Sequence, residues 1–299
     1  MAGISRFNSS LKEISRLFAG SKRSVFTYAE MEEIFEENRQ VWRLPQSMNT
    51  DRFVLRLVEK LNFREIELNF AGLQSRRLYA QGNPEKEEIA TAAFPRAYLS
   101  HFTASSINGL TEQIPKTVYL TVEQSVKQHA DTQDARNNLI QENIDKAFRK
   151  PQRLSEAVAE WDEVKYVLLR GKATGNMGVR TIGDVKNVRV TDLERTLVDI
   201  TVRPSYSGGV FEVLKAYQNA GESGKFSVNK LLSYLKRMDF IYPYQQAVGF
   251  YMELSGAFKP QQVARLKELK TDLNFYLAYD MKETDYAEDW NIYYPKGIR

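Results

Sequence analysis

The sequence predicts an α+β protein in which a small N-terminal domain precedes a larger mixed domain. Residues 24–80 carry two helical patterns followed by two strand patterns. Beyond residue 83, strand patterns come early and at the very end, with a run of helical patterns between them. This distribution favours α+β over the regular alternation of a doubly wound sheet. A length of 299 residues also makes two domains the natural expectation.

The first helical pattern begins at Thr27, and Glu30 three residues later predicts a capping box. Apolar residues then recur at helical spacing and form one face: Tyr28, Met31, Ile34 and Phe35. Glutamates occupy the rest of the helix: Glu30, Glu32, Glu33, Glu36 and Glu37. Because phosphate repels such a face, we expect this helix to lie away from a nucleic-acid backbone.

The second helical pattern follows a short connection, and Asn49 or Thr50 can cap it. Its apolar residues form a stripe suited to a core: Phe53, Val54, Leu57, Val58 and Leu61. Arg52 and Arg56 project from the opposite face, one turn apart. Helix-turn-helix proteins lay their second helix in the major groove, where guanine offers two acceptors to a guanidinium group. We therefore predict that Arg52 and Arg56 read guanine.

A β-hairpin is predicted next. Apolar and polar residues alternate from Phe63 to Phe70, residues 71–75 form a turn, and Arg76 to Ala80 return as a second strand. The tip carries polar and basic side chains: Gln74, Ser75, Arg76 and Arg77. Such side chains allow a wing to bind phosphates or enter a minor groove. Two helices followed by a hairpin predict a winged helix-turn-helix domain.

Basic residues concentrate around these elements. The whole chain has 42 Lys+Arg against 38 Asp+Glu. Between Arg39 and Gln81, eight basic residues face four acidic ones. A local basic stripe indicates nucleic-acid binding better than net charge does. The predicted contacts with double-stranded DNA are Arg39, Arg43, Asn49, Arg52, Arg56, Gln74, Ser75, Arg76 and Arg77. Two alternatives stay open: a solvated arginine face, and a winged domain that binds protein.

The composition excludes several classes of site. The chain has no cysteine, which excludes disulfides, thiolate chemistry and cysteine-ligated metal centres. Its two histidines, His101 and His129, lie in unlike contexts without a second ligand at helical spacing, so no histidine metal site is predicted. No stretch approaches the ~20 apolar residues of a membrane span. The N-terminus lacks a signal-peptide core and predicts an amphipathic helix ending near Gly20. We expect a cytoplasmic protein with no membrane partner.

The domain boundary is placed after Gly82, which gives an N-terminal domain of residues 1–82 and a C-terminal domain of residues 83–299. Helices are expected at 85–93, 97–110 and 130–150, and strands at 116–122, 164–169, 188–190, 275–279 and 290–294. Four glycines make 171–183 a loop or hairpin. Further helices are expected to begin at Thr191, Gly208, Ser227 and Pro243, with Glu194 as the capping-box partner of Thr191.

Three carboxylates, Asp192, Glu194 and Asp199, are the strongest candidates for a metal-dependent active site. A structural interpretation explains more, because Asp192 and Glu194 fall in a first helical turn and Arg195 is the helical partner of Asp199. The glycine-rich stretch 171–175 lacks the spacing of a phosphate loop. We therefore predict no catalytic residue, no metal and no cofactor. A nucleic-acid- or nucleotide-processing enzyme with a winged targeting domain is the alternative.

Two phrases carry a family resemblance. Residues 94–122 (FPRAYLSHFTASSINGLTEQIPKTVYLTV) and 189–204 (RVTDLERTLVDITVRP), the latter followed by a glycine-led helix at 207–210, resemble AbiEi-type antitoxins of bacterial abortive-infection systems. The resemblance covers most of residues 24–260, with the winged unit where that family carries its DNA-binding domain. The polar stretch Gln124 to Ala159, expected to be helical, departs from shorter family members.

The resemblance implies a non-enzymatic antitoxin of a type IV toxin–antitoxin system, which serves in phage defence. Such proteins repress their own promoter by binding inverted repeats through the winged domain. Their C-terminal domain counters a nucleotidyltransferase-like toxin, in general without a stable complex. Carried over by position, the DNA-contacting residues are Arg52, Arg56, Gln74, Ser75, Arg76 and Arg77.

Overall fold

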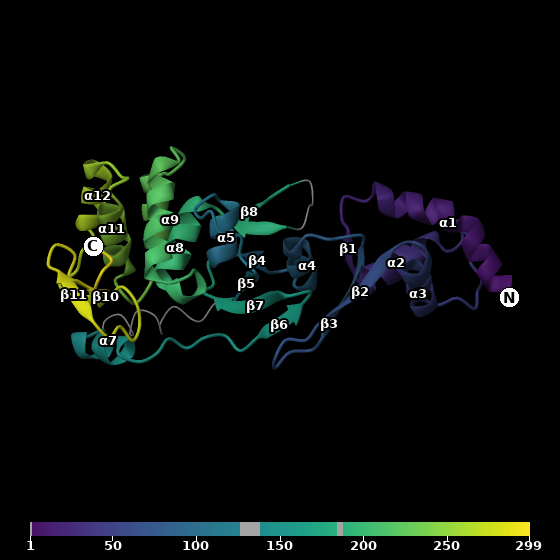
Figure 1. Ribbon diagram of the computed structural model, residues 1–299, viewed down its shortest axis with the longest axis horizontal. Coiled ribbons are helices and arrows are strands. Elements are labelled where there is room, and N and C mark those ends of the chain that lie inside the picture. The colour runs from purple at the N-terminus through teal and green to yellow at the C-terminus, as the bar shows by residue number, and fades with distance from the viewer. Residues whose placement is uncertain (1, 126–137, 184–187) are drawn as a thin grey trace. The chain divides into compact units, whose positions relative to one another are not determined.

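The computed structural model describes residues 2–125, 138–183 and 188–299, and its fold is mixed α+β, as predicted (Figure 1). The chain divides into two compact units. The first comprises Met1–Ala97, Glu156–Val167 and Thr181–Arg189, and the second comprises Tyr98–Ser155, Leu168–Arg180 and Val190–Arg299. No helix within the described ranges is both long and apolar enough to cross a bilayer.

The first unit contains the elements predicted for the winged domain. Its order is α1 (Ala2–Gly20), β1 (Val25–Thr27), α2 (Tyr28–Asn38), α3 (Thr50–Lys60), β2 (Phe63–Leu68), β3 (Arg76–Gln81) and α4 (Lys86–Ala93). The three strands form an antiparallel sheet in the order β1-β3-β2. Two helices between the first and second strands, followed by a β2–β3 ribbon (Figure 1), are compatible with a winged helix-turn-helix.

Local sequence explains why α2 and α3 begin where they do. The Thr27 hydroxyl accepts a hydrogen bond from the Glu30 amide at 3.3 Å, and the Glu30 carboxylate accepts one from the Thr27 amide at 2.7 Å. Asn49 caps α3 by accepting a hydrogen bond from the Arg52 amide at 3.1 Å. Both caps satisfy amides that the helices leave unpaired. The capping box predicted at Thr27 is therefore confirmed.

An aromatic core joins α1, α2 and α3. Trp42 stacks on Phe53 with ring centroids 5.6 Å apart, and Phe35 lies against the same ring at 5.2 Å. Phe7 of α1 meets Phe53 edge-on at 6.2 Å. The stripe predicted for α3 holds for Phe53, Val54 and Leu57, which are buried, whereas Val58 is 37% exposed. The apolar face of α3 is thus narrower than the sequence suggests.

A second hairpin also belongs to this unit. β6 (Val158–Trp161) pairs antiparallel with the start of β7 (Val164–Gly171). The Trp161 ring is covered by the guanidinium carbon of Arg64, 5.4 Å from its centroid. The prediction of a helical stretch from Gln124 to Ala159 is therefore wrong at its C-terminal end, because residues 151–157 are not helical and β6 begins at Val158. Residues 126–137 of that stretch lie outside the described residues.

The second unit is built on strands that follow the order β7-β5-β4-β9-β8 in a six-stranded sheet. These are the end of β7, then β5 (Thr117–Glu123), β4 (Tyr98–Leu99), β9 (Arg189–Thr191) and β8 (Val179–Thr181). β4 is antiparallel to β5 and parallel to β9. The C-terminal sheet has the order β10-β12-β11, from β10 (Phe275–Tyr276), β11 (Thr284–Ala287) and β12 (Ile292–Pro295).

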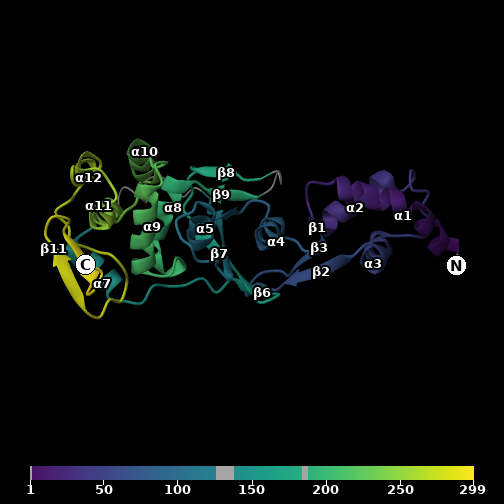
Figure 2. The ribbon, with the colours of Figure 1, turned by 45° about the horizontal axis from the view of Figure 1, so that its top comes forward.

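Helices occupy the rest of this unit: α5 (His101–Ile107), α7 (Gln141–Phe148), α8 (Leu193–Val202), α9 (Val210–Glu222), α10 (Val228–Met238), α11 (Tyr244–Ser255) and α12 (Pro260–Lys267). A 3-10 turn, η1 (Pro204–Tyr206), follows α8. α11 lies beside both α9 and α12 (Figure 2). The Trp290 ring fills a space at Gly249 of α11 that no β-carbon leaves open.

Three predicted helix boundaries are corrected. α5 begins at His101, not residue 97, because Tyr98 and Leu99 pair in β4. α8 is capped by Asp192, one residue after the predicted cap, and the Asp192 carboxylate accepts a hydrogen bond from the Arg195 amide at 2.9 Å. Glu194 does not close a box and accepts from the Ser227 amide at 2.8 Å instead. In the described part of 130–150, the helix is α7, from Gln141.

Candidate nucleic-acid interface

The exposed face of α3 carries one guanidinium that keeps donors available. Arg52 is exposed and uses Nη1 to donate to the Ser47 carbonyl at 3.0 Å. Arg56 is half-buried, and its Nη1 lies 2.5 Å from the Glu59 carboxylate. A base edge needs a free fork of donors. Of the two predicted guanine readers, Arg52 retains such a fork, while the charge of Arg56 is already opposed.

The connection between α2 and α3 is held by another predicted contact residue. Nη2 of Arg39 donates to the carbonyls of Pro45 and Gln46, at 3.2 and 2.6 Å, and its guanidinium carbon lies 5.3 Å from the Phe35 ring centroid. These bonds fix the loop before α3, so Arg39 positions that helix. Arg43 is exposed, in a left-handed backbone conformation with φ 48°.

The wing arginines point to opposite faces of the hairpin. In the β2–β3 register, Arg76 faces Leu68 and Arg77 faces Glu67. Side chains of neighbouring residues alternate between the faces of a strand. Arg76 accordingly covers the Phe94 ring, with its guanidinium carbon 4.9 Å from the centroid, and its Nε is buried without a partner among the described residues. Arg77 is the wing arginine on the exposed face.

Acidic residues share that exposed face. Nε of Arg77 lies 3.0 Å from the Glu65 carboxylate, and the Ser75 hydroxyl donates to Glu67 at 2.9 Å. Gln74 is exposed at the turn. A phosphate approaching Arg77 therefore meets two carboxylates as well. The described geometry brings Asn49, Arg52 and Arg56 together on α3, but it does not bring Arg76 and Arg77 to one face.

Two exposed residues of α3 were not among the predicted contacts. Leu55 is 54% exposed, and Lys60 is exposed at the last turn. Lys60 was counted in the basic stripe but not singled out, because its position in the last turn has a ready alternative in the helix dipole. Leu55 gave no signal in sequence, since an apolar residue in an amphipathic helix is ordinarily assigned to the core.

The three carboxylates of the alternative enzymatic interpretation each have a basic partner. Asp192 and Glu194 both bind Lys230, at 3.0 Å each. Asp199 accepts a hydrogen bond from Nε of Arg195 at 2.8 Å, with both side chains buried. Within the described ranges, no group of three or more histidine, cysteine or acidic side chains is close enough to hold a metal ion. These contacts agree with the structural roles predicted for the carboxylates.

The histidines differ in what can be said of them. His101 is buried at the start of α5, where its Nδ1 lies 2.9 Å from the Ser100 hydroxyl. Burial, together with the nearby charges of Arg203 and Arg195, lowers the pKa of His101 to about 3. This imidazole is neutral at physiological pH. His129 lies outside the described residues.

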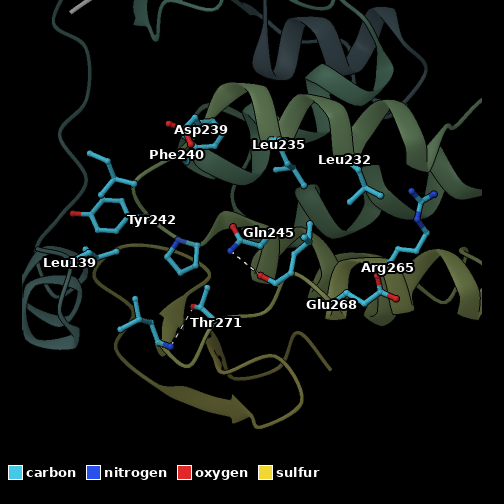
Figure 3. Close-up of a pocket in the computed structure, with 15 residues that line it drawn as sticks. Leu139, Leu232, Leu235, Asp239, Phe240, Tyr242, Gln245, Arg265, Glu268 and Thr271 are labelled. Atoms are coloured by element: carbon cyan, nitrogen blue, oxygen red, sulfur yellow. Dashed lines mark hydrogen bonds between the residues drawn. The ribbon is translucent and has the colours of Figure 1, made fainter. Parts of the chain in front are cut away.

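The largest pocket that the described residues form has a volume of about 740 Å³ and lies in the second unit. Figure 3 shows Leu232 and Leu235 of α10 on one side and Arg265 and Glu268 on another. A volume of this order suits a small molecule. Because one cation and one anion stand beside each other on its wall, the lining favours no single ligand chemistry.

Fold and surface together describe an α+β protein whose N-terminal helices and hairpin are compatible with a winged helix and expose Arg52. No protein-family model matches the sequence, and no curated protein matches it. Among solved structures, the chain is similar to the crystal structure of the RV2827C protein from Mycobacterium tuberculosis, with a TM-score of 0.60 and 12% identity. The match covers 97% of this chain and 91% of the other, and at this identity it shows a shared fold.

Proposed function

We propose that this chain is a DNA-binding autorepressor and antitoxin of a type IV, AbiE-like toxin–antitoxin system. It would act in the cytoplasm, without enzymatic activity, by binding inverted repeats in its own promoter. Its C-terminal domain would counter a nucleotidyltransferase-like toxin without forming a stable complex. The observation that carries the DNA-binding part is the β1-α2-α3-β2-β3 order with an exposed, capped α3 whose first turn presents Arg52.

The electrostatics of α2 and α3 support the same orientation. The exposed glutamates of α2 include Glu32, Glu33, Glu36 and Glu37, which phosphate would repel. On α3, Arg52 and Lys60 are exposed and have no carboxylate partner among the described residues. A duplex therefore approaches most favourably with α3 toward it and α2 away from it.

The antitoxin part rests on the two family phrases in the second unit. The ERTL segment forms α8, where Arg195 is buried against Asp199 and Thr196 accepts no solvent. These residues stabilise the fold of the C-terminal domain and contact no partner directly. Since Asp192, Glu194 and Asp199 are all engaged with cations, no specific observation favours an enzymatic function.

DNA binding is tested by fluorescence anisotropy with the duplex upstream of the coding sequence. Replacing Arg52 by alanine should cost about 1–3 kcal/mol of discrimination at one base pair, because a bidentate contact to guanine is lost. Arg6→Ala is the control, since Arg6 is an exposed arginine of α1 in the same unit. Equal affinities of the wild type and Arg52→Ala for every sequence tested would refute the assignment of α3.

The antitoxin activity is tested separately by co-expression with the nucleotidyltransferase-like protein encoded beside this gene. Growth should be restored by the wild type and by Arg52→Ala alike, because α3 serves the promoter and not the toxin. Size-exclusion chromatography of the mixed proteins should give two separate peaks. If the chain fails to restore growth, the antitoxin part of the proposal is wrong whatever the DNA result.

A further inference from the structure

A small cavity in the second unit is lined by an unusual set of charged side chains. Its volume is about 80 Å³, and its lining residues are His101, Thr121, Gly171, Lys172, Arg195, Asp199, Val202, Arg203, Met238 and Phe240. A single water needs roughly 10–15 Å³ of such space. The cavity is therefore large enough for several oxygen atoms and too small for a nucleotide base.

Positive charge exceeds negative charge in this lining. Lys172, Arg195 and Arg203 stand against one carboxylate, that of Asp199. Arg195 and Asp199 are both buried and hydrogen-bonded to each other, so they offset one another. The charges of Lys172 and Arg203 have no carboxylate among the lining residues to balance them. A cation pair beside a partly enclosed space attracts an anion.

The two arginines differ in how many donors remain. Arg195 uses its whole fork: Nε donates to Asp199 at 2.8 Å, Nη1 to the Met177 carbonyl at 2.7 Å and to Thr174 at 3.0 Å, and Nη2 to the Tyr98 hydroxyl at 3.1 Å. Arg203 is half-buried and donates only from Nη1, to the Arg170 carbonyl at 3.2 Å. Most of the Arg203 guanidinium is therefore available to a ligand.

His101 is held in place for a neutral role. Its backbone has φ 51°, a left-handed conformation that costs about 1–3 kcal/mol and persists only where the surroundings fix it. Nδ1 contacts the Ser100 hydroxyl, which in turn lies 2.7 Å from the Thr121 hydroxyl. When that hydroxyl chain donates toward Nδ1, the remaining proton of the neutral ring sits on Nε2. Such a ring can donate a hydrogen bond to an anion.

We propose that this cavity binds a tetrahedral oxyanion of the phosphate class, held by Arg203 and Lys172 with His101 as a neutral donor. Arg195, fixed by Asp199, contributes its charge without needing to move. Phe240 lines both this cavity and the larger pocket (Figure 3), and its ring lies 5.6 Å from Nζ of Lys172. Lys172 also donates to the carbonyl of Asp239, so the α10–α11 connection is tied to the cation that faces the anion. The assignment does not rest on the proposed function.

Binding is measured by isothermal titration of inorganic phosphate into the full chain, with chloride replacing phosphate at constant ionic strength in the reference. The wild type should bind one phosphate per chain. Because the chain has only two histidines, imidazole NMR signals are easily assigned, and phosphate should shift that of His101. Adenosine 5′-monophosphate is a second probe: tighter binding than free phosphate would identify the oxyanion as the phosphoryl group of a larger ligand.

A matched pair of variants tests the residues. Arg203→Gln should weaken phosphate binding roughly tenfold or more, since a hydrogen bond between charged groups is lost. Arg170→Gln removes a neighbouring exposed arginine that does not line the cavity and should change affinity less than twofold. If Arg203→Gln fails to fold, Lys172→Gln, at an exposed position, decides the question in its place. Absence of phosphate binding by the wild type, or equal weakening in Arg170→Gln, would overturn the proposal.

Discussion

Replacing Glu65 by glutamine should strengthen DNA binding, because this carboxylate occupies Arg77 on the exposed face of the wing. Nε of Arg77 lies 3.0 Å from the Glu65 carboxylate, and the two side chains are 57% and 49% exposed. Ion pairs this exposed contribute little to folding. The substitution therefore leaves the hairpin intact while it releases one guanidinium and removes one charge that repels phosphate.

The magnitude follows from counterion release. Each phosphate contact adds about 0.9 to the slope of log affinity against log salt concentration. If Arg77 of the Glu65→Gln variant gains one contact, its affinity should fall about 3.5-fold more than that of the wild type between about 50 and about 200 mM salt. Anisotropy titrations at four or more salt concentrations resolve a slope difference of this size.

Glu37→Gln separates this effect from a change in net charge. Glu37 is an exposed glutamate of α2 in the same unit, and no basic partner is recorded for it among the described residues. The charge change is identical, but no arginine is released, so the slope should stay that of the wild type. Equal slopes for both variants would show that the Arg77–Glu65 pair has no bearing on DNA binding.

Three further predictions concern stability. Gly249→Ala should lower the unfolding temperature, since the added β-carbon collides with the buried Trp290 ring at a cost of about 1–3 kcal/mol or more; calorimetry measures it. Asn49→Ala should cost about 1 kcal/mol in urea unfolding, because the cap of α3 is lost, with Asn49→Asp as the rescuing variant. Arg195→Met should cost about 3–5 kcal/mol, because it leaves the Asp199 carboxylate buried without its partner. Burial already raises the pKa of Asp199 and Arg195 opposes that rise, so in the variant the folded-state pKa climbs further above the unfolded one. Stability of that kind is present at low pH and lost as pH rises, so the deficit should shrink in acid and a constant deficit would contradict this reasoning.

Local rules predicted the parts of the fold that local interactions determine. The capping box at Thr27, the cap at Asn49 and the alternation from Glu65 to Leu68 all depend on residues within one or two turns. The boundary of α5 depends on β4, whose two residues pair with β5 and β9 from distant parts of the chain. No pattern within residues 97–110 reveals those partners, so the helix was predicted to start too early.

The same distinction applies to the small cavity, which sequence reasoning did not find. His101 was set aside because it lacks a second ligand at helical spacing, yet the chemistry beside it comes from Lys172 and Arg203. These residues are contributed by the end of β7 and the end of α8. A search for ligands close in sequence misses a site assembled from three separated segments.

A count of basic residues overestimates a nucleic-acid surface because it ignores what each cation already contacts. Arg56 and Arg77 each lie beside a glutamate, and Arg39 is committed to loop carbonyls. Arg64 and Arg76 cover aromatic rings instead of facing outward. The remaining cations of the stripe are exposed and have no recorded carboxylate partner among the described residues: Arg43, Arg52 and Lys60. Three free cations, two of them on α3, predict a shallow salt dependence for one chain, so tight promoter binding would require more than one chain on each inverted repeat.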